Sequence, residues 1–193
     1  VACLHGTSSN SKILRMQLGR LVHLGQDRVE FVFVEGKLRT EDINPDNLYL
    51  ESQKKAFPNQ DFFQYAKLLS QDLPDGLLDY ENFDESIADL QSQLAEVGPV
   101  DGVLGFSQGS NMLFMLAAHA VHGRGAPLAF VVLICNSMPG FVARYPELFG
   151  EPLRIPALLV QATADLFPDA TGALVPRPGA AAASLFAEAA TAT

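Results

Sequence analysis

Positive charge is scarce in this sequence. Its 193 residues include 13 lysines and arginines against 22 aspartates and glutamates, so the formal net charge is −9 at pH 7. Nucleic acids and anionic membranes are bound through clustered lysine and arginine side chains, which contact the phosphates. The sequence has no such cluster, and this argues against nucleic acid as a partner.

Long apolar runs are also missing. The longest, residues 126–135, contains Pro127 and is far shorter than the about 20 apolar residues that a membrane-spanning helix needs. We interpret this run as a buried β-strand and expect no stable membrane insertion. With 48% hydrophobic and 18% charged residues, the composition is typical of one globular domain, which we expect to cover residues 1–193.

The sequence has only two cysteines, Cys3 and Cys135, and both lie in apolar runs that are typical of strands. We predict unpaired structural thiols, because a disulfide would need the two strands side by side at matching height. Unpaired cysteines favour a reducing compartment, which we take to be the cytoplasm. The chain begins without methionine inside an apolar run, so we expect further residues, and room for a targeting segment, before Val1.

What the sequence does have is the pattern Gly-x-Ser-x-Gly from Gly105 to Gly109, directly after an apolar run and before an amphipathic segment. In hydrolases this order of strand, motif and helix holds a serine on a strained turn, with its hydroxyl above the sheet. Both glycines are needed because the neighbouring backbones pass too closely for a Cβ atom. We therefore predict that Ser107 is a nucleophile and that a helix runs from Ser110 to about His122.

The remaining apolar patterns predict the fold class. Continuous apolar runs are typical of strands that are buried on both faces. These runs are residues 1–4, 31–34, 103–106, 130–134 and 157–160. Helical spacing connects Leu14, Leu18 and Leu21 in a helix that Gly25 ends, and it recurs over residues 83–97. We predict an α/β fold with a mostly parallel central sheet and helices on both faces.

Two further segments have a less regular pattern of apolar residues. The Ala-rich residues 180–193 predict a helix anchored by Leu185 and Phe186, inside which the chain ends. Residues 36–80 have no clear period and are rich in aromatic side chains. Loops this long are functional or contain small elements of their own, so this segment is either a lid or acyl pocket or a cover for the sheet.

A serine nucleophile needs donors for the oxyanion that forms when it attacks a carbonyl. One donor should be the backbone N–H of Gln108, directly after the nucleophile. The other should come from the loop after an early strand, and we assign it to the backbone N–H of Thr7, which follows His5 and Gly6.

The acid of the catalytic set should follow a strand downstream of Ser107. Asp165 comes shortly after the apolar run at 157–160, and Asp169 is the alternative. Its role would be to orient the catalytic imidazole and to stabilise its charged form.

The base is harder to place, because all four histidines precede Asp165. His119 lies twelve residues beyond Ser107 on the same predicted helix, roughly 18 Å away at about 1.5 Å per residue. His122 lies farther still, His23 lies near the end of the first helix, and His5 belongs to the oxyanion loop. We expect the catalytic histidine beyond residue 193, in a chain that is cut at both ends.

At these residues the sequence resembles the FSH-type family of serine hydrolases, the ovarian-cancer-associated protein 2-like group of the α/β-hydrolase superfamily. The resemblance rests on residues 1–6 (VACLHG), 98–109 (GPVDGVLGFSQG) and 155–160 (IPALLV), which lead to Asp165. It implies an α/β-hydrolase fold and an esterase or thioesterase, with Ser107 as nucleophile and Asp165 as acid. The His-Gly loop that such proteins carry after the final helix has no match in this sequence.

Together these observations predict a serine hydrolase that cleaves small acyl esters through an acyl-enzyme, although the fragment itself should be inactive. No metal or organic cofactor is predicted, because no group of histidine, cysteine and acidic residues has ligand spacing. Two alternatives stay open. One is a binding module that keeps the fold but has lost the base, and the other is a thioesterase or lysophospholipase with the same chemistry.

Overall fold

The computed structural model describes residues 1–43, 45–46, 48–69, 78–137, 139–161, 166–168, 174–176 and 183–192. Its strands are β1 (Ala2–Leu4), β2 (Val32–Val34), β3 (Leu38–Arg39), β4 (Phe63–Gln64), β5 (Gly102–Phe106), β6 (Phe130–Ile134), β7 (Leu153–Val160), β8 (Leu166–Pro168), β9 (Leu174–Pro176) and β10 (Phe186–Ala192). Its helices are α1 (Ser11–Gln17), α2 (Gly19–Gly25), α3 (Thr40–Ile43), α4 (Leu48–Ala56), α5 (Phe83–Val97), α6 (Gln108–Val121), the 3₁₀-helix η2 (Gly140–Arg144) and α7 (Pro146–Phe149).

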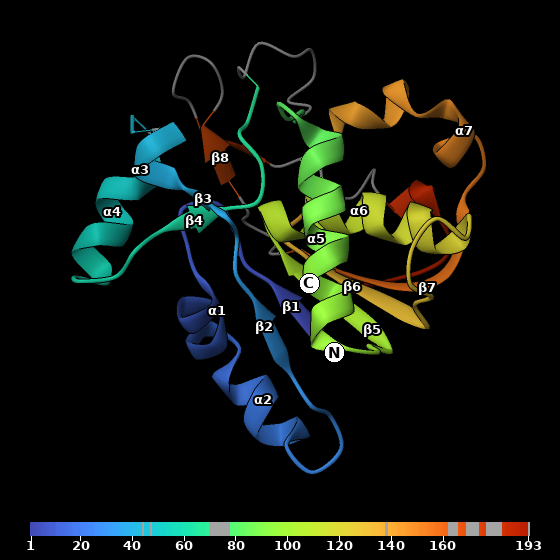
Figure 1. Ribbon diagram of the computed structural model, residues 1–193, viewed down its shortest axis with the longest axis horizontal. Coiled ribbons are helices and arrows are strands. Elements are labelled where there is room, and N and C mark those ends of the chain that lie inside the picture. Colours follow the sequence, from blue (N-terminus) through green and yellow to red (C-terminus); the bar gives the residue numbers. More distant parts are fainter. Residues whose placement is uncertain are drawn as a thin grey trace.

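The centre of the molecule is a parallel sheet in the order β10-β7-β6-β5-β1-β2 (Figure 1). The predicted α/β fold with a parallel sheet is therefore confirmed. All six strands run the same way, so their carboxyl ends meet at one edge of the sheet. Two-stranded antiparallel pairs, β3 with β4 and β8 with β9, lie outside it.

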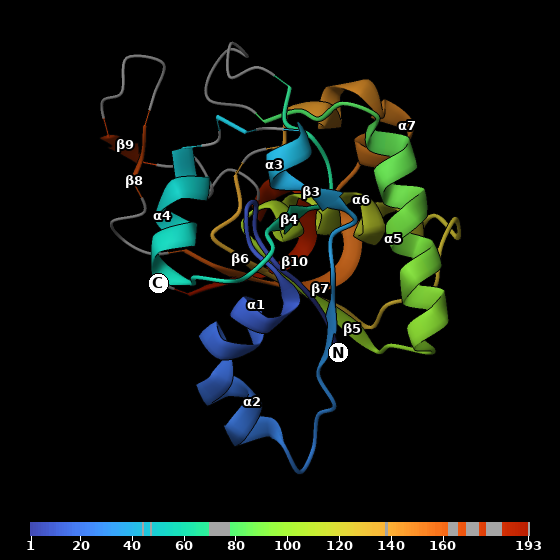
Figure 2. The ribbon, with the colours of Figure 1, turned by 60° about the vertical axis from the view of Figure 1, so that its left-hand side comes forward.

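Alternate side chains of the strands face two different cores. Ala2 and Leu4 of β1 belong to the large core that α5 and α6 cover, whereas Cys3 between them packs with Leu14 of α1 on the other face. Figure 2 shows α1 and α5 on opposite sides of the sheet. Because both faces of the sheet are covered here, successive side chains of β1 are all buried, and this explains why such strands are continuous apolar runs in the sequence.

Neither Cys3 nor Cys135 forms a disulfide in the structure. Cys3 is buried, and burial raises the pKa of its thiol to about 11.

The helix predicted from apolar spacing over residues 83–97 is present as α5. Its buried stripe consists of Phe83, Ser86, Ile87, Leu90 and Leu94, and Gly98 with φ 99° follows its last residue. Such a positive φ costs glycine little, which explains why the helix stops there.

The first predicted helix is broken in two. The prediction of one continuous helix through Leu21 is wrong, because α1 ends at Gln17, its C-cap Leu18 closes the last turn with its amide, and α2 starts at Gly19. Asn10 caps α1: its side chain accepts a hydrogen bond from the amide of Ile13 (2.8 Å), as is usual for asparagine at this position. Leu21 is 44% exposed and α2 buries none of its residues, so the apolar period here does not mark a core face.

The prediction of a helix over residues 180–193 is also wrong. Residues 186–192 form β10, which pairs in parallel with β7 at the edge of the sheet. The ring of Phe186 is buried and stacks on Phe114 of α6, with 5.6 Å between the ring centres. Backbone pairing with an open sheet edge, together with this aromatic anchor, outweighs the helix propensity of alanine.

The segment with no clear period contains β3, α3, α4 and β4, which are small elements of its own. Phe62 is buried in a cluster with Ile13 and Leu50, so this aromatic side chain joins α4 to α1. The alternative that the segment serves as a lid stays a prediction. Over the part of the chain that the structure describes, no helix is both long and apolar enough to cross a membrane.

The order of the strands reverses direction at one point of the sheet edge. From β1 the chain continues to β2 on one side, while β5 lies on the other side of β1. In open parallel sheets, ligands bind beyond the carboxyl ends of the strands where the strand order reverses in this way. Leu4 of β1 is in register with Gly105 of β5, so the two following loops meet there.

Candidate active site

Ser107 lies at this reversal point, between the last residue of β5 and the first residue of α6. Its backbone has φ 52° and ψ −114°, which is strained for a residue with a Cβ atom. The amide of Ser107 donates to the carbonyl oxygen of Ile134 at the end of β6 (2.9 Å). The turn is thus the strained strand-to-helix bend that the motif predicts.

The two glycines of the motif lie where no side chain fits. A Cβ atom on Gly105 would lie 2.5 Å from the carbonyl oxygen of Gly109 and from the amide nitrogen of Ser110. A Cβ atom on Gly109 would contact the carbonyl oxygen of Leu4 and lie 2.7 Å from that of His5. These contacts allow α6 to start directly against the end of β1, which brings Ser107 beside the loop that follows β1.

That loop, residues 5–10, lies next to the serine. A Cβ atom on Gly6 would be 3.2 Å from the Cβ atom of Ser107, so the two backbones are in close contact. Thr7 follows directly. Within the described residues, the backbone amides of Thr7 and Gln108 have no hydrogen-bond acceptor. The structure therefore brings Ser107 together with the loop that carries Thr7, and leaves two amides available near the bend.

His5 is completely buried, and every polar group it has is engaged. Its amide donates to the hydroxyl of Tyr65 (2.9 Å), and its carbonyl accepts from the amide of Gly109 (3.1 Å). In the ring, Nδ1 is 2.8 Å from the carbonyl oxygen of Gly6, and Nε2 accepts from the amide of Gly36 (2.9 Å). His5 is thus a structural centre of the loop, and its ring has no nitrogen free to take a proton from Ser107.

Glu35 adds a charge to this arrangement. Its Oε1 lies 3.0 Å from Nε2 of His5, which accepts from Gly36 when the ring is neutral and donates to Glu35 when it is protonated. The carboxylate also accepts from the amide and the hydroxyl of Ser11, at the start of α1. Burial raises the pKa of Glu35, but the hydrogen bonds with His5 and Ser11, together with the charge of His5, outweigh burial and hold that pKa below its ordinary value.

This lowered pKa predicts how stability depends on pH. A carboxyl whose pKa is lower in the folded state stabilises the fold above its unfolded pKa of about 4.3 and loses that contribution as the pH falls. Glu35 is 38% exposed, so we expect Glu35→Gln to lower the free energy of unfolding by only about 1 kcal/mol at pH 7. Urea unfolding should show the gap between variant and wild type closing between pH 5 and pH 3.

The matched control is Glu96→Gln, because Glu96 is an exposed residue of α5. It should unfold like the wild type at both pH values. An equal loss for Glu35→Gln at pH 7 and pH 3 would contradict the assigned role of its charge.

Of the other three histidines, His23 is far from the bend in the sequence, and His119 and His122 are at the end of α6 opposite to Ser107. His119, near the end of α6, accepts from Nε2 of Gln91 (3.0 Å), and burial lowers its pKa. His122 contacts the carbonyl oxygen of Leu148 through Nε2 (3.1 Å), and His23 belongs to the last turn of α2. None of these described contacts involves Ser107.

Asp165 and Asp169 lie outside the residues that the structure describes, so the acid stays a prediction. Within the described ranges, no group of three histidine, cysteine, aspartate or glutamate residues is arranged to hold a metal ion.

Sequence reasoning missed the residues that hold the site together. Tyr65 and Glu35 contact His5 from positions 60 and 30 residues further along the chain, and neither belongs to a recognisable motif. The side chain of Gln108 was also missed: it bonds to the backbone of Tyr65 and Ala66. Only the short spacing of Gln108 from the nucleophile could have pointed to it.

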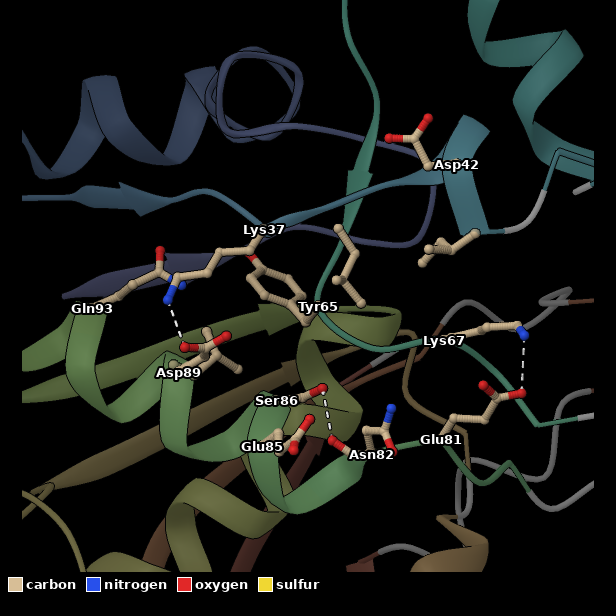
Figure 3. Close-up of a pocket in the computed structure, with 13 residues that line it drawn as sticks. Lys37, Asp42, Tyr65, Lys67, Glu81, Asn82, Glu85, Ser86, Asp89 and Gln93 are labelled. Carbon is tan, nitrogen blue, oxygen red and sulfur yellow. Dashed lines mark hydrogen bonds and ion pairs between the residues drawn. The ribbon is translucent and has the colours of Figure 1, made fainter.

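A cavity of about 410 Å³ is lined by Tyr65 and by residues of α5 and of the segments around β3. Figure 3 shows Tyr65 on its wall, with ion pairs between Lys37 and Asp89 (2.6 Å) and between Lys67 and Glu81 (3.1 Å) at its rim. These pairs connect α5 and its preceding turn to the segments that flank β3 and β4.

A parallel sheet with a serine on a strained bend after its central strand defines the class of α/β-hydrolase-fold serine hydrolases. The family description "Serine hydrolase (FSH1)" matches residues 1–175. The chain belongs to this family, as the resemblance in its sequence implied.

Individual relatives agree with this assignment. The chain is 33% identical to the esterase FPY3 of Fusarium mangiferae over 141 residues, which cover 72% of this chain and 57% of that protein. It is 27% identical to the esterase OVCA2 of Danio rerio over 124 residues, 61% of this chain and 55% of that protein. The chain thus spans just over half the length of these relatives.

A solved structure supports the fold. The crystal structure of the Bacillus cereus carboxylesterase superposes with a TM-score of 0.51 at 17% sequence identity, over 84% of this chain and 64% of that one. At this identity the likeness shows the α/β-hydrolase fold alone.

Proposed function

We propose that this protein hydrolyses carboxylic esters through an acyl-enzyme, with Ser107 as the nucleophile. The observation that carries the proposal is the backbone of Ser107, strained at φ 52° on the bend between β5 and α6. Strain of this kind persists only where the surrounding structure holds it, and it is typical of active sites. Here it presents a hydroxyl beside the loop after β1, at the reversal point of the sheet.

In the proposed reaction, Oγ of Ser107 attacks the ester carbonyl and a histidine takes its proton. The negative charge on the carbonyl oxygen is held by the backbone N–H groups of Thr7 and Gln108, which have no other acceptor in the described part of the chain. The histidine then gives the proton to the leaving alcohol. Water attacks the acyl-enzyme by the same route and releases the acid.

The proposed acid is Asp165, which would orient the histidine. We propose that the base is none of the four histidines of this chain, which is supported by the bonds that engage His5 and by the contacts that His119 and His122 make elsewhere. We propose that it comes from polypeptide outside these 193 residues, since the relatives extend beyond the part that this chain matches.

Family membership supports the proposed substrate class. The relatives reported above are named esterases, and the family is one of serine hydrolases. We therefore propose a small acyl ester as the substrate. A thioester or a lipid ester would use the same nucleophile and the same oxyanion donors.

Pre-steady-state kinetics of the full-length protein with p-nitrophenyl butyrate tests this proposal. Formation of an acyl-enzyme predicts a burst of about one p-nitrophenol per protein molecule, followed by slower steady turnover. Parallel assays with the butyryl thioester and with a lysophospholipid assign the substrate class. A folded protein that shows neither a burst nor turnover with any of the three would contradict the proposal and favour a binding module.

A further inference from the structure

The loop after β1 is held from outside rather than by its own structure. Its residue Ser8 is completely buried and has φ 51°, a left-handed conformation that is unfavourable for serine. A strained loop keeps such a conformation only if neighbouring groups fix it. The neighbouring groups here come from residues 61–66, the segment that follows α4 and contains β4.

Residues 61–66 are bonded to the loop at both of its ends. At the far end, Nδ2 of Asn10 donates to the carbonyl oxygen of Asp61 (2.8 Å). One residue earlier, Ser9 and Phe63 exchange two backbone hydrogen bonds (3.2 and 2.7 Å). These bonds fix residues 9 and 10, but they do not reach Gly6 and Thr7.

Tyr65 fixes the near end of the loop. Its hydroxyl accepts the amide of His5 (2.9 Å) and donates to the carbonyl oxygen of Val34 at the end of β2 (2.9 Å). Its ring also lies against the ring of His5, with 4.7 Å between the centres. Burial raises the pKa of Tyr65 well above its ordinary value, so the hydroxyl stays protonated and keeps both hydrogen bonds.

The same tyrosine is attached to the bend that carries Ser107. The side-chain oxygen of Gln108 accepts the amide of Tyr65 (2.8 Å), and its nitrogen donates to the carbonyl oxygen of Ala66 (2.8 Å). Gln108 is therefore joined to Tyr65 through its side chain, while its own backbone N–H is one of the two proposed oxyanion donors. Tyr65 in turn holds His5, two residues before the other donor, Thr7.

Residues 61–66 also have little room to move away. A Cβ atom on Gly36 would lie 2.7 Å from the carbonyl oxygen of Gln64, so the chain after β2 passes directly against this segment. The amide of Gly36 donates to His5 as well (2.9 Å). A buried set of bonds centred on Tyr65 thus links the loop that carries Thr7 to the bend that carries Gln108.

We propose that Tyr65 is a positioning residue for the oxyanion hole, which sets the backbone N–H of Thr7 relative to that of Gln108 through the hydrogen bond from its hydroxyl to His5. This inference rests on the proposed function, because it assumes that these two amides hold the oxyanion. Tyr65 acts through His5 and Gln108 and does not itself contact the reacting atoms.

The test is Tyr65→Phe, which removes one oxygen atom and leaves the ring in place. Interactions with the oxyanion form only in the transition state, so a displaced donor should lower kcat and leave KM unchanged. Loss of a whole donor costs about 10²- to 10³-fold, and we expect a displaced one to lower kcat by about 10- to 50-fold. KM for p-nitrophenyl butyrate should change by less than about twofold.

Tyr80→Phe is the matched control. Tyr80 is also buried, and its hydroxyl accepts a hydrogen bond from Nδ2 of Asn111 in α6 (2.8 Å). Both variants should lose similar thermal stability, and only Tyr65→Phe should lose kcat. A second readout is inhibition by a butyryl trifluoromethyl ketone, whose affinity should fall with kcat/KM in Tyr65→Phe and stay unchanged in Tyr80→Phe.

If Tyr65→Phe does not fold, Gln108→Met tests the same link by removing the side-chain bonds of Gln108 instead. It keeps the backbone N–H but removes both side-chain bonds to residues 65 and 66, and it should also lower kcat. The inference fails if the wild type shows a burst and those of Tyr65→Phe and Gln108→Met that are soluble keep the wild-type kcat. If the wild type shows no burst and no turnover, the proposed function fails first and the inference with it.

Discussion

Ser107→Ala is expected to lower ester hydrolysis by at least about 10⁴-fold. The hydroxyl is the only group on the bend that can form the acyl-enzyme, and loss of a nucleophile removes the covalent route altogether. KM has no clear meaning for the residual rate, so the measurement is kcat/KM for p-nitrophenyl butyrate, with the burst as a second observable. A variant that keeps a tenth of the wild-type rate would exclude Ser107 as the nucleophile.

Ser107→Gly is the informative partner of this variant. Both substitutions remove the hydroxyl, but glycine accepts φ 52° and ψ −114° without strain. Relief of about 1–3 kcal/mol of strain, less the entropy that glycine loses on folding, should leave Ser107→Gly about 1 kcal/mol more stable than Ser107→Ala. Equal stability of the two inactive variants would mean that the bend stores no strain.

Gly109→Ala is expected to destabilise the protein by about 4 kcal/mol or to prevent folding. The added Cβ would contact the carbonyl oxygen of Leu4 and come within 2.7 Å of that of His5. Both are backbone atoms at the end of a central strand, so they cannot move without shifting β1 or the start of α6. Losses of this size are rare for single substitutions and are typical of overpacked cores.

Urea unfolding checks this prediction, with Gly19→Ala as the control. A Cβ on Gly19 would meet no atom within 4 Å, and this residue lies in α2, where alanine is the better helix former. The control should gain up to about 1 kcal/mol. A Gly109→Ala protein as stable as the wild type would show that α6 does not start in direct contact with β1.

The elbow and the strands beside it could be predicted because their signals are local. Two glycines two residues from the central serine mark the bend, and unbroken apolar runs mark strands that are covered on both faces. The cap of α1 at Asn10 and the end of α5 at Gly98 likewise depend on residues within one turn. These elements can therefore be predicted from nearby residues, without knowledge of contacts to distant parts of the chain.

The wrong predictions concern segments whose secondary structure depends on contacts with residues far away in the sequence. Residues 186–192 consist largely of alanine, yet they form a strand because β7 offers a free edge and Phe114 a place for the ring of Phe186. The division between α1 and α2 is similar: the leucine spacing continues through it, but the core does not, since α2 buries no side chain. Apolar period alone does not tell which residues a neighbouring element covers.

The candidate site likewise combines residues that nearby sequence predicts with residues that it does not. Ser107, Gln108 and Thr7 could be named from the motif and from the loop after the first strand. Tyr65 could not, because its role depends on three hydrogen bonds to residues between 31 and 60 positions away, none of which leaves a pattern in the sequence.

The most direct test of the central claim is covalent labelling of the full-length protein with a fluorophosphonate probe, followed by peptide mass spectrometry. The probe reacts with a serine only when the hydroxyl is activated and the phosphonyl oxygen is held by oxyanion donors. We predict one adduct per molecule, on the peptide that contains Ser107, and none in Ser107→Ala. Folded protein that stays unlabelled, or that is labelled at a different serine, would contradict the account.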